Sequence, residues 1–443
     1  MRAVRVTRLE GPDAVEVAEV EEPTSAGVVI EVHAAGVAFP DALLTRGRYQ
    51  YRPEPPFVLG AEIAGVVRSA PDNSQVRSGD RVVGLTMLTG GMAEVAVLSP
   101  ERVFKLPDNM TFEAGAGVLF NDLTVYFALA VRGRLQAGET VLVHGAAGGI
   151  GTSTLRLAPA LGASRTVAVV STQEKAELAT VAGATDVVLA EGFKDAVQEL
   201  TNGRGVDIVV DPVGGDRFTD SLRSLAAGGR LLVIGFTGGE IPTVKVNRLL
   251  LNNIDVVGVG WGAWSLTHPD ALAQQWSQLE RLLRSGKLPP PEPVVYPLDQ
   301  AAAAIASLEN RTAKGKVVLR VRDKRPSRDA SPACSGQFAA SSLVAVGVGY
   351  VMPHNSQLAW RQARGVSVVF AIQFPCGDAI IGVHVDLMTV GELKMEISGV
   401  IPDESCAGCP GEIEERTLVV GWVVWVDGDH FCGRGFDGRQ SQL

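Results

Sequence analysis

The stretch Val141-Leu-Val-His144-Gly145-Ala-Ala-Gly-Gly-Ile-Gly151 decides the fold. Residues 141–144 predict a buried strand and residues 152–161 predict a helix, so the glycines between them form a tight turn. In a strand–turn–helix unit, backbone N–H groups and the positive end of the helix dipole face a bound anion. The stretch therefore predicts a nucleotide site that holds a pyrophosphate at the N-terminus of the helix.

Each residue of this turn has an expected part in cofactor binding. Gly148 lets the backbone approach the phosphates, and Gly151 lets the helix pack closely on the strand. Gly149 and Ile150 complete the turn between them. Ala146 replaces the first glycine of the usual fingerprint, so the pattern is A-x-G-x-x-G. A plain strand-to-helix turn is the alternative, but the correctly placed strand and helix favour nucleotide binding.

The residues about 20 positions beyond the turn indicate whether a chain binds NADH or NADPH, because NAD-binding chains carry an acidic residue there. This chain has Ser171 at the end of a predicted strand and Lys175 on the following turn. A hydroxyl and an ammonium suit a 2′-phosphate, which a carboxylate would repel. The alternative is that Lys175 is an ordinary solvated residue of the helix. Because the acidic residue of NAD-binding chains is absent as well, the sequence favours NADPH.

The surrounding pattern predicts how the first 322 residues are organised. Residues 1–118 contain short strands bounded by Gly, Pro, Asp or Asn, which is typical of a small β-barrel. Residues 119–257 alternate apolar strands with helices, which predicts a doubly wound parallel sheet. Residues 258–322 end in a helix and a strand that are expected to return to the first domain.

Residues 323–443 form a C-terminal extension that begins with a linker-like run. It is expected to be disordered or small and β-rich, or to be non-homologous sequence added by a shifted reading frame. It carries all five cysteines. Cys406 and Cys409 have C-x-x-C spacing, but one such pair without a second is weak evidence for a metal or redox site. The sequence predicts no function for this extension.

Composition excludes several classes of protein. The net charge of −9 over 443 residues gives no basic excess to meet phosphates or a membrane surface, so neither nucleic acid nor membrane is an expected partner. No apolar run reaches the roughly 18 residues of a membrane span. The N-terminus lacks the apolar segment of a signal peptide, and a cytoplasmic location is the default expectation.

Three further segments carry a resemblance to a known family. Residues 47–65, 78–82 and 211–215 resemble those of the medium-chain dehydrogenase/reductase superfamily, and residues 1–322 are similar to its zinc-independent quinone oxidoreductase branch. The resemblance implies a GroES-like catalytic domain, a Rossmann domain that binds NADPH, and an active site in the cleft between them. It also implies a homodimer, since residues 254–259 often pair across the subunits in this family.

The departures from the superfamily pattern concern metal binding. Zinc-dependent members have a Cys near position 38 and a His next to Glu62, whereas this chain has Ala38 and Ala61. Without these ligands a zinc ion cannot be held to polarise a substrate oxygen, so no metal is expected. The Asn-x-x-Asp motif of the quinone reductases is also altered, since Ala38 precedes Asp41.

The resemblance and the spacing also suggest the remaining site residues. Tyr49 is the candidate catalytic residue, because a phenol can stabilise negative charge on a substrate oxygen or supply its proton; a packing role is the alternative. Thr124 would bond the nicotinamide carboxamide, unless it merely caps its helix. By the same resemblance, the cofactor also contacts residues at the carboxyl edge of the sheet, namely Val213, Gly235, Phe236 and Gly260.

These expectations combine into one predicted activity. The chain is expected to transfer a hydride from NADPH to a small-molecule quinone or related α,β-unsaturated carbonyl compound without a catalytic metal. A 2-enoyl-thioester reductase is the alternative enzyme. An NADPH-binding regulatory protein with little turnover is the alternative from another class.

Overall fold

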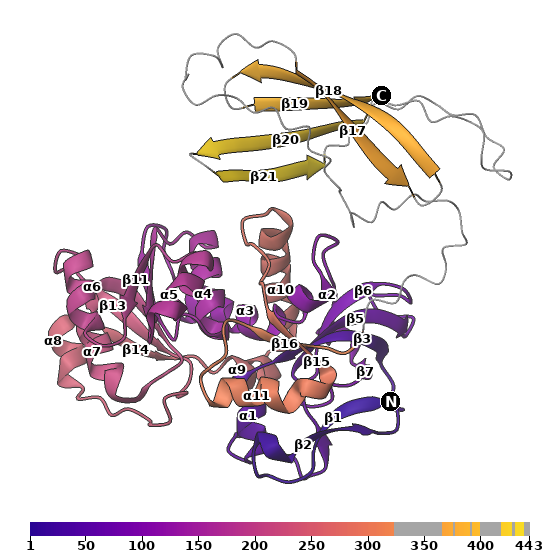
Figure 1. Cartoon of the computed structure of the whole chain (residues 1–443). Helices are drawn as coiled ribbons and strands as arrows, with labels where there is room; N and C mark the ends of the chain where they lie inside the picture. The colour runs from indigo at the N-terminus through magenta and orange to yellow at the C-terminus, as the bar shows by residue number, and fades with distance from the viewer. Residues whose placement is uncertain (323–365, 375–376, 390–391, 399–417, 428–429, 438–443) are drawn as a thin grey trace. The chain divides into compact units, whose positions relative to one another are not determined.

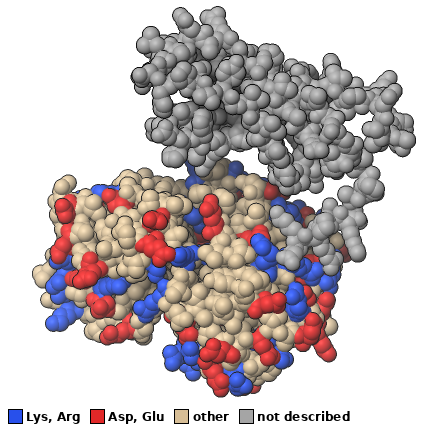
Figure 2. All heavy atoms as spheres, in the orientation of Figure 1, with Lys and Arg blue, Asp and Glu red and all other residues tan. Residues whose placement is uncertain are grey.

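The computed structural model (Figure 1) describes residues 1–322, 366–374, 377–389, 392–398, 418–427 and 430–437. The chain divides into two compact units, Met1–Arg328 and Asp329–Leu443. Acidic and basic side chains are interspersed on the face of the first unit shown in Figure 2, with no single basic surface. Among the described residues, no helix is both long and apolar enough to cross a membrane.

A six-stranded parallel sheet forms one half of the first unit, in the order β11-β10-β9-β12-β13-β14. The strands are β9 (Thr140–His144), β10 (Arg165–Val170), β11 (Asp186–Leu189), β12 (Val206–Asp211), β13 (Leu225–Val233) and β14 (Asp255–Gly258). The helices between them are α4 (Gly149–Ala160), α5 (Gln173–Val181), α6 (Phe193–Leu200), α7 (Phe218–Arg223) and α8 (Asn247–Asn252). The chain runs from β9 to one side of the sheet and then returns to the other. The switch point, where such sheets bind ligands, therefore lies between β9 and β12.

The apolar character of these strands follows from their burial on both faces. Val141, Leu142 and Val143 in β9 are fully buried, as are Ile208, Val209 and Val210 in the neighbouring β12. Helices cover both faces of the sheet, so neither face can carry polar side chains without partners. The structure confirms the predicted α/β fold with a doubly wound parallel sheet.

The other half of the first unit is the GroES-like β domain. Its main sheet has the order β15-β16-β3-β5-β6-β8, with β7 paired to β3, and a smaller sheet has the order β2-β1-β4. The strands are β1 (Arg2–Val6), β2 (Val15–Glu19), β3 (Val28–Val37), β4 (Phe57–Val58), β5 (Glu62–Ser69), β6 (Arg81–Leu85), β7 (Val95–Leu98), β8 (Val103–Lys105), β15 (Val294–Pro297) and β16 (Val317–Arg320). Because β16 pairs antiparallel with β3, the end of the first unit returns to this domain.

Helices link and cover the two halves. They are α1 (Phe39–Thr45), α2 (Phe112–Gly115), α3 (Leu119–Tyr126), α9 (Trp261–Thr267), α10 (Pro269–Arg284) and α11 (Ala301–Glu309). The strand-rich pattern of the first 118 residues did not predict α1, which begins after Ala38. The Asp41 side chain starts this helix, because its Oδ2 accepts the Ala38 N–H at 2.7 Å.

The described residues of the second unit form five antiparallel strands in sequential order. They are β17 (Val366–Phe374), β18 (Gly377–Thr389), β19 (Glu392–Ser398), β20 (Leu418–Asp427) and β21 (His430–Asp437). Each strand pairs with the next along the chain, which makes the described part a β-meander. The pair Cys406 and Cys409 lies outside the described residues.

Candidate active site

The glycine-rich turn lies between β9 and α4, as its sequence predicts. Helix α4 begins at Gly149, three residues earlier than expected, with Gly148 at its N-cap. A Cβ on Gly151 would overlap the Cα of Ala146, so only glycine fits where the helix crosses the turn. A Cβ on Gly149 would overlap the amide of Asn121, a side chain that the sequence pattern did not predict for the site.

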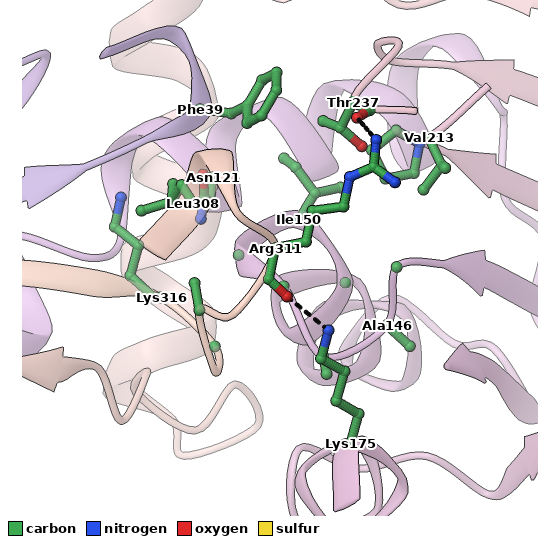
Figure 3. Close-up of a pocket in the computed structure, with 18 of the residues that line it drawn as sticks. Phe39, Asn121, Ala146, Ile150, Lys175, Val213, Thr237, Leu308, Arg311 and Lys316 are labelled. Carbon is green, nitrogen blue, oxygen red and sulfur yellow. Dashed lines mark hydrogen bonds between the residues drawn. The ribbon is translucent and has the colours of Figure 1, made fainter. Parts of the chain in front are cut away.

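This turn lines a pocket of about 260 Å³ (Figure 3). The pocket brings together eight of the predicted cofactor residues: Ala146, Gly148, Gly149, Ile150, Gly151, Ser171, Lys175 and Val213. They come from the carboxyl ends of β9, β10 and β12 and from the segments that follow. This is the place where a doubly wound sheet binds a dinucleotide.

The charged side chains that line the pocket are all basic. They are Lys175, Arg217, Arg311 and Lys316, and no Asp or Glu is among the described lining residues. Opposite charge attracts an anion most strongly where protein walls exclude water and lower the effective dielectric constant. The pocket is therefore suited to a ligand that carries several phosphates.

Residues 311–316, between α11 and β16, lie across the mouth of the glycine turn. Lys175 Nζ donates to the Arg311 carbonyl at 2.9 Å, and the Arg311 guanidinium donates to the Thr237 carbonyl at 3.1 Å (Figure 3). The guanidinium also donates to the Gly238 carbonyl at 3.2 Å. The Gly315 N–H donates to the Ala147 carbonyl at 2.7 Å. The β domain thus contributes one wall of the nucleotide pocket.

A buried ion pair joins the β domain to the pocket wall. Lys316 Nζ donates to Glu62 Oε1 at 2.5 Å and to the Val37 carbonyl at 3.1 Å. The second Glu62 oxygen accepts the Phe120 N–H at 2.8 Å. Burial raises the pKa of Glu62, and the Lys316 ammonium opposes that rise. Glu62 is therefore fully engaged in holding Lys316 and the start of α3.

The residues at the expected zinc position do not fit a zinc ion. Ala38 and Ala61 offer no donor atom, and the neighbouring Glu62 carboxylate is bonded to Lys316. In the described part of the chain, no three His, Cys, Asp or Glu side chains form a group that could hold a metal. Tetrahedral zinc needs three or four such ligands.

Asp41 is a buried carboxyl close to this ion pair. Its Oδ1 is buried without a hydrogen-bond partner among the described residues, while Oδ2 accepts the Ala38 N–H. Burial raises the pKa of Asp41 to about 7, an effect that the Ala38 hydrogen bond and the charge of Lys316 partly oppose. Asp41 therefore takes up a proton near neutral pH.

Tyr49, the candidate catalytic residue, is half-buried against the apolar core of the β domain. It is not among the residues that line the nucleotide pocket. Burial raises the pKa of Tyr49, and the nearby Asp41 charge raises it further. The phenol is therefore a weaker acid than usual and is neutral at physiological pH, so it can donate a hydrogen bond. Its catalytic role stays a prediction.

Four other predicted cofactor residues also lie outside the pocket lining. Thr124 is buried within α3 and donates to the Phe120 carbonyl at 2.7 Å, so it does not cap the helix. Its oxygen remains able to accept a bond from a carboxamide. Gly235 and Phe236 precede Thr237, which does line the pocket, and Gly260 is the N-cap of α9. These roles stay predictions.

Comparisons with known proteins agree with this architecture. Residues 24–108 match the alcohol dehydrogenase GroES-like domain, and residues 149–283 match the zinc-binding dehydrogenase family. The chain is 35% identical over 324 residues to quinone oxidoreductase-like protein 2 of Rattus norvegicus, which covers 72% of this chain and 92% of that protein.

Two solved structures extend the comparison. A probable oxidoreductase from Mycobacterium abscessus is 42% identical, with a TM-score of 0.66 over 72% of this chain and 99% of its own. The quinone oxidoreductase from Thermus thermophilus, solved alone and in complex with NADPH, is 32% identical, with a TM-score of 0.62 over 72% of this chain and 100% of its own.

The Rossmann sheet, the GroES-like domain and the pocket between them define an oxidoreductase of the medium-chain dehydrogenase/reductase class. Within this class, the chain belongs to the quinone oxidoreductase branch, as its resemblance predicted.

Proposed function

We propose that this chain transfers a hydride from NADPH to quinones or related α,β-unsaturated carbonyl compounds, without a catalytic metal. The observation that carries the proposal is the pocket that joins the glycine turn to Ser171, Lys175 and two basic residues of the β domain. The NADPH complex of the Thermus thermophilus relative supports the choice of cofactor.

The chain's own residues explain how the cofactor would be held. The N–H groups that open α4 would hold the pyrophosphate, and the Ser171 hydroxyl and the Lys175 ammonium would hold the 2′-phosphate. Lys175 donates to the Arg311 carbonyl in this structure, and its ammonium would exchange that neutral acceptor for the phosphate when the cofactor binds. NADPH, when bound, supplies the hydride, and the protein supplies its orientation.

The substrate half of the site depends on a proton donor in place of a metal. Reduction of a carbonyl-conjugated acceptor places negative charge on its oxygen. Tyr49 is the side chain proposed to stabilise that charge, because a neutral phenol can donate a hydrogen bond to a substrate oxygen. Ala38 and Ala61 leave no donor set for a zinc ion to do so.

The test is steady-state oxidation of NADPH by the full chain, with a simple quinone and a 2-enoyl-thioester supplied in separate assays. We expect quinone-dependent oxidation, which Tyr49→Phe lowers about tenfold or more in kcat while NADPH affinity is unchanged. Tyr51→Phe is the matched control, because Tyr51 is exposed and lies two residues away.

The other outcomes identify the competing functions. Oxidation with the enoyl-thioester alone would assign the chain to the 2-enoyl-thioester reductases. Tight NADPH binding without oxidation by either acceptor would assign it to regulatory binding proteins. The cytoplasmic location stays a prediction that this assay does not address.

A further inference from the structure

Arg217 is a basic residue of the pocket that neither the glycine fingerprint nor the Ser171–Lys175 pair accounts for. It ends a short 3₁₀ helix, Gly215–Arg217, at the carboxyl end of β12. Ser171 and Lys175 follow β10, and β9 lies between these two strands. Arg217 therefore enters the same pocket from the side opposite Lys175.

The turn that leads to Arg217 depends on two glycines. Gly214 and Gly215 have φ values of +65° and +72°, in the left-handed region that glycine adopts without strain. A Cβ on Gly214 would lie 2.8 Å from a ring carbon of Phe236. Glycine at these two positions therefore allows the tight turn between β12 and Arg217.

A buried hydrogen-bond chain ties the Arg217 backbone to the strand that carries the glycine turn. Ser221 Oγ donates its only hydrogen to the Arg217 carbonyl at 3.0 Å, so His144 Nε2 must donate to Ser221 Oγ at 2.8 Å. Both His144 and Ser221 are at most 1% exposed. Because His144 immediately precedes Gly145, this chain sets the position of Arg217 relative to the phosphate-binding turn.

The Arg217 guanidinium makes no hydrogen bond or ion pair with the described residues, although it lines the pocket. The other basic side chains there differ: Lys175 and Arg311 bond to carbonyls, and Lys316 bonds to Glu62. The nearby Asp220 is bonded to Arg223. Arg217 therefore keeps its full donor capacity for a ligand.

We infer that Arg217 is a cofactor-selecting residue, which grips the 2′-phosphoadenosine end of the cofactor from the side opposite Lys175. The inference rests on the proposed use of NADPH. In a doubly wound sheet the ribose 2′-substituent lies near the residues that follow the next strand after the glycine turn, here Ser171 at the end of β10, so the long Arg217 side chain would reach it across the turn. A guanidinium can donate two parallel hydrogen bonds to a phosphate, and it stays charged at every physiological pH.

The experiment measures the binding of adenosine 2′,5′-bisphosphate and of 5′-AMP to the full chain by isothermal titration calorimetry. We expect Arg217→Ala to weaken the bisphosphate about 10- to 100-fold, the size of a lost charged hydrogen bond, and 5′-AMP less than about threefold. Arg217→Lys keeps the charge without the fork and should lie between the two. Arg223→Ala, an exposed arginine on α7, is the matched control and should change neither affinity.

Two results would overturn the inference about Arg217, and a third result would overturn the proposed preference for NADPH. Equal weakening of both ligands by Arg217→Ala would place Arg217 on the adenine or the 5′-phosphate, and unchanged affinities would remove it from the site. Unfolding midpoints of the variants, measured alongside, show that each is folded. If the wild-type chain binds the bisphosphate no better than 5′-AMP, the proposed preference for NADPH fails, whatever Arg217 does.

Discussion

Gly151 and Gly148 belong to one fingerprint, yet they meet different surroundings in the folded chain. A Cβ on Gly151 would overlap the turn, whereas a Cβ on Gly148 would meet only the Gly145 carbonyl at 3.3 Å. We expect Gly151→Ala to lower the free energy of unfolding by about 1–3 kcal/mol, the usual cost of overpacking. Gly148→Ala should weaken NADPH binding and leave stability nearly unchanged.

Urea unfolding and titration with NADPH distinguish these two effects. Loss of stability in both variants, or in neither, would contradict the separate roles assigned to the two glycines.

Asp41 gives the stability of the protein a specific dependence on pH. Its folded pKa of about 7 lies above the ordinary value near 3.9, so the fold favours the protonated carboxyl. This contribution is fully present below about pH 4 and is lost as the pH rises through 7. We expect Asp41→Asn to remove that dependence, since an amide oxygen can still accept the Ala38 N–H.

The measurement is the free energy of unfolding in urea at several values between pH 4 and 8, for wild type and variant. Asp220→Asn, on the exposed face of α7, is the control and should follow the wild type. The same slope in Asp41→Asn as in wild type would show that Asp41 does not take up this proton.

At the scale of single residues, the sequence predicts the nucleotide site where its parts are close along the chain. The glycine turn, Ser171 and Lys175 lie within 31 residues of each other, and all line one pocket. Arg311 and Lys316 reach the pocket only because β16 pairs with β3. The sequence offers one signal for these two residues, a cluster of basic side chains before β16, the last strand of the first unit.

At the scale of elements, a buried ion pair holds α3 against α4. The Arg156 guanidinium donates to both oxygens of Asp122 at 3.0 and 2.8 Å and to the Pro289 carbonyl at 3.0 Å, and the two side chains are 8% and 0% exposed. The pair thereby fixes α4, which begins at the phosphate-binding turn, relative to the segment that leads to β15.

We expect Arg156→Met to lower the free energy of unfolding by about 3–5 kcal/mol, because the Asp122 charge would be left buried and unpaired. Arg284→Met is the control. Its pair with Glu280 is half exposed at the arginine, so the expected loss is about 0.5 kcal/mol or less. Chemical denaturation measures the free energy of unfolding of both variants. Equal losses of this free energy would mean that the buried ion pair contributes no more to stability than the exposed one.

The sequence predicts most strands of this protein and fewer of its helix ends. Buried strands such as β9 and β12 are continuous apolar runs, which burial on both faces requires. Helix α4 began earlier than expected because its first residues are glycines, which have low helix propensity, and packing overrides that propensity here. Helix α1 was missed since its start depends on the single Asp41 cap.

At the scale of the whole molecule, the six-stranded sheet ends at β14. Helix α8 and the segment before it carry four large apolar side chains that are 70–77% exposed, namely Ile241, Val246, Leu250 and Leu251. This exposed surface and the adjacent edge strand support the predicted homodimer through residues 254–259.

We expect the wild-type chain to have twice the mass of a monomer by light scattering, and Leu251→Asp to shift it toward the monomer. Val181→Asp is the control. Val181 is 80% exposed, but it lies on α5, which follows β10 and not the edge strand β14. A monomeric wild type would contradict the dimer. The domain division at residues 118, 257 and 322 likewise stays a prediction, testable by limited proteolysis.

The central claim is that a nucleotide pocket with basic walls and no zinc ligand set serves NADPH-dependent reduction of a conjugated acceptor. Its most direct test is kcat/KM of the full chain with a simple quinone, measured with NADPH and with NADH. We expect quinone-dependent oxidation of both, with NADPH favoured at least about tenfold, the lower bound for one lost charged contact to the 2′-phosphate. Equal use of the two cofactors, or no quinone-dependent oxidation of either, would contradict it.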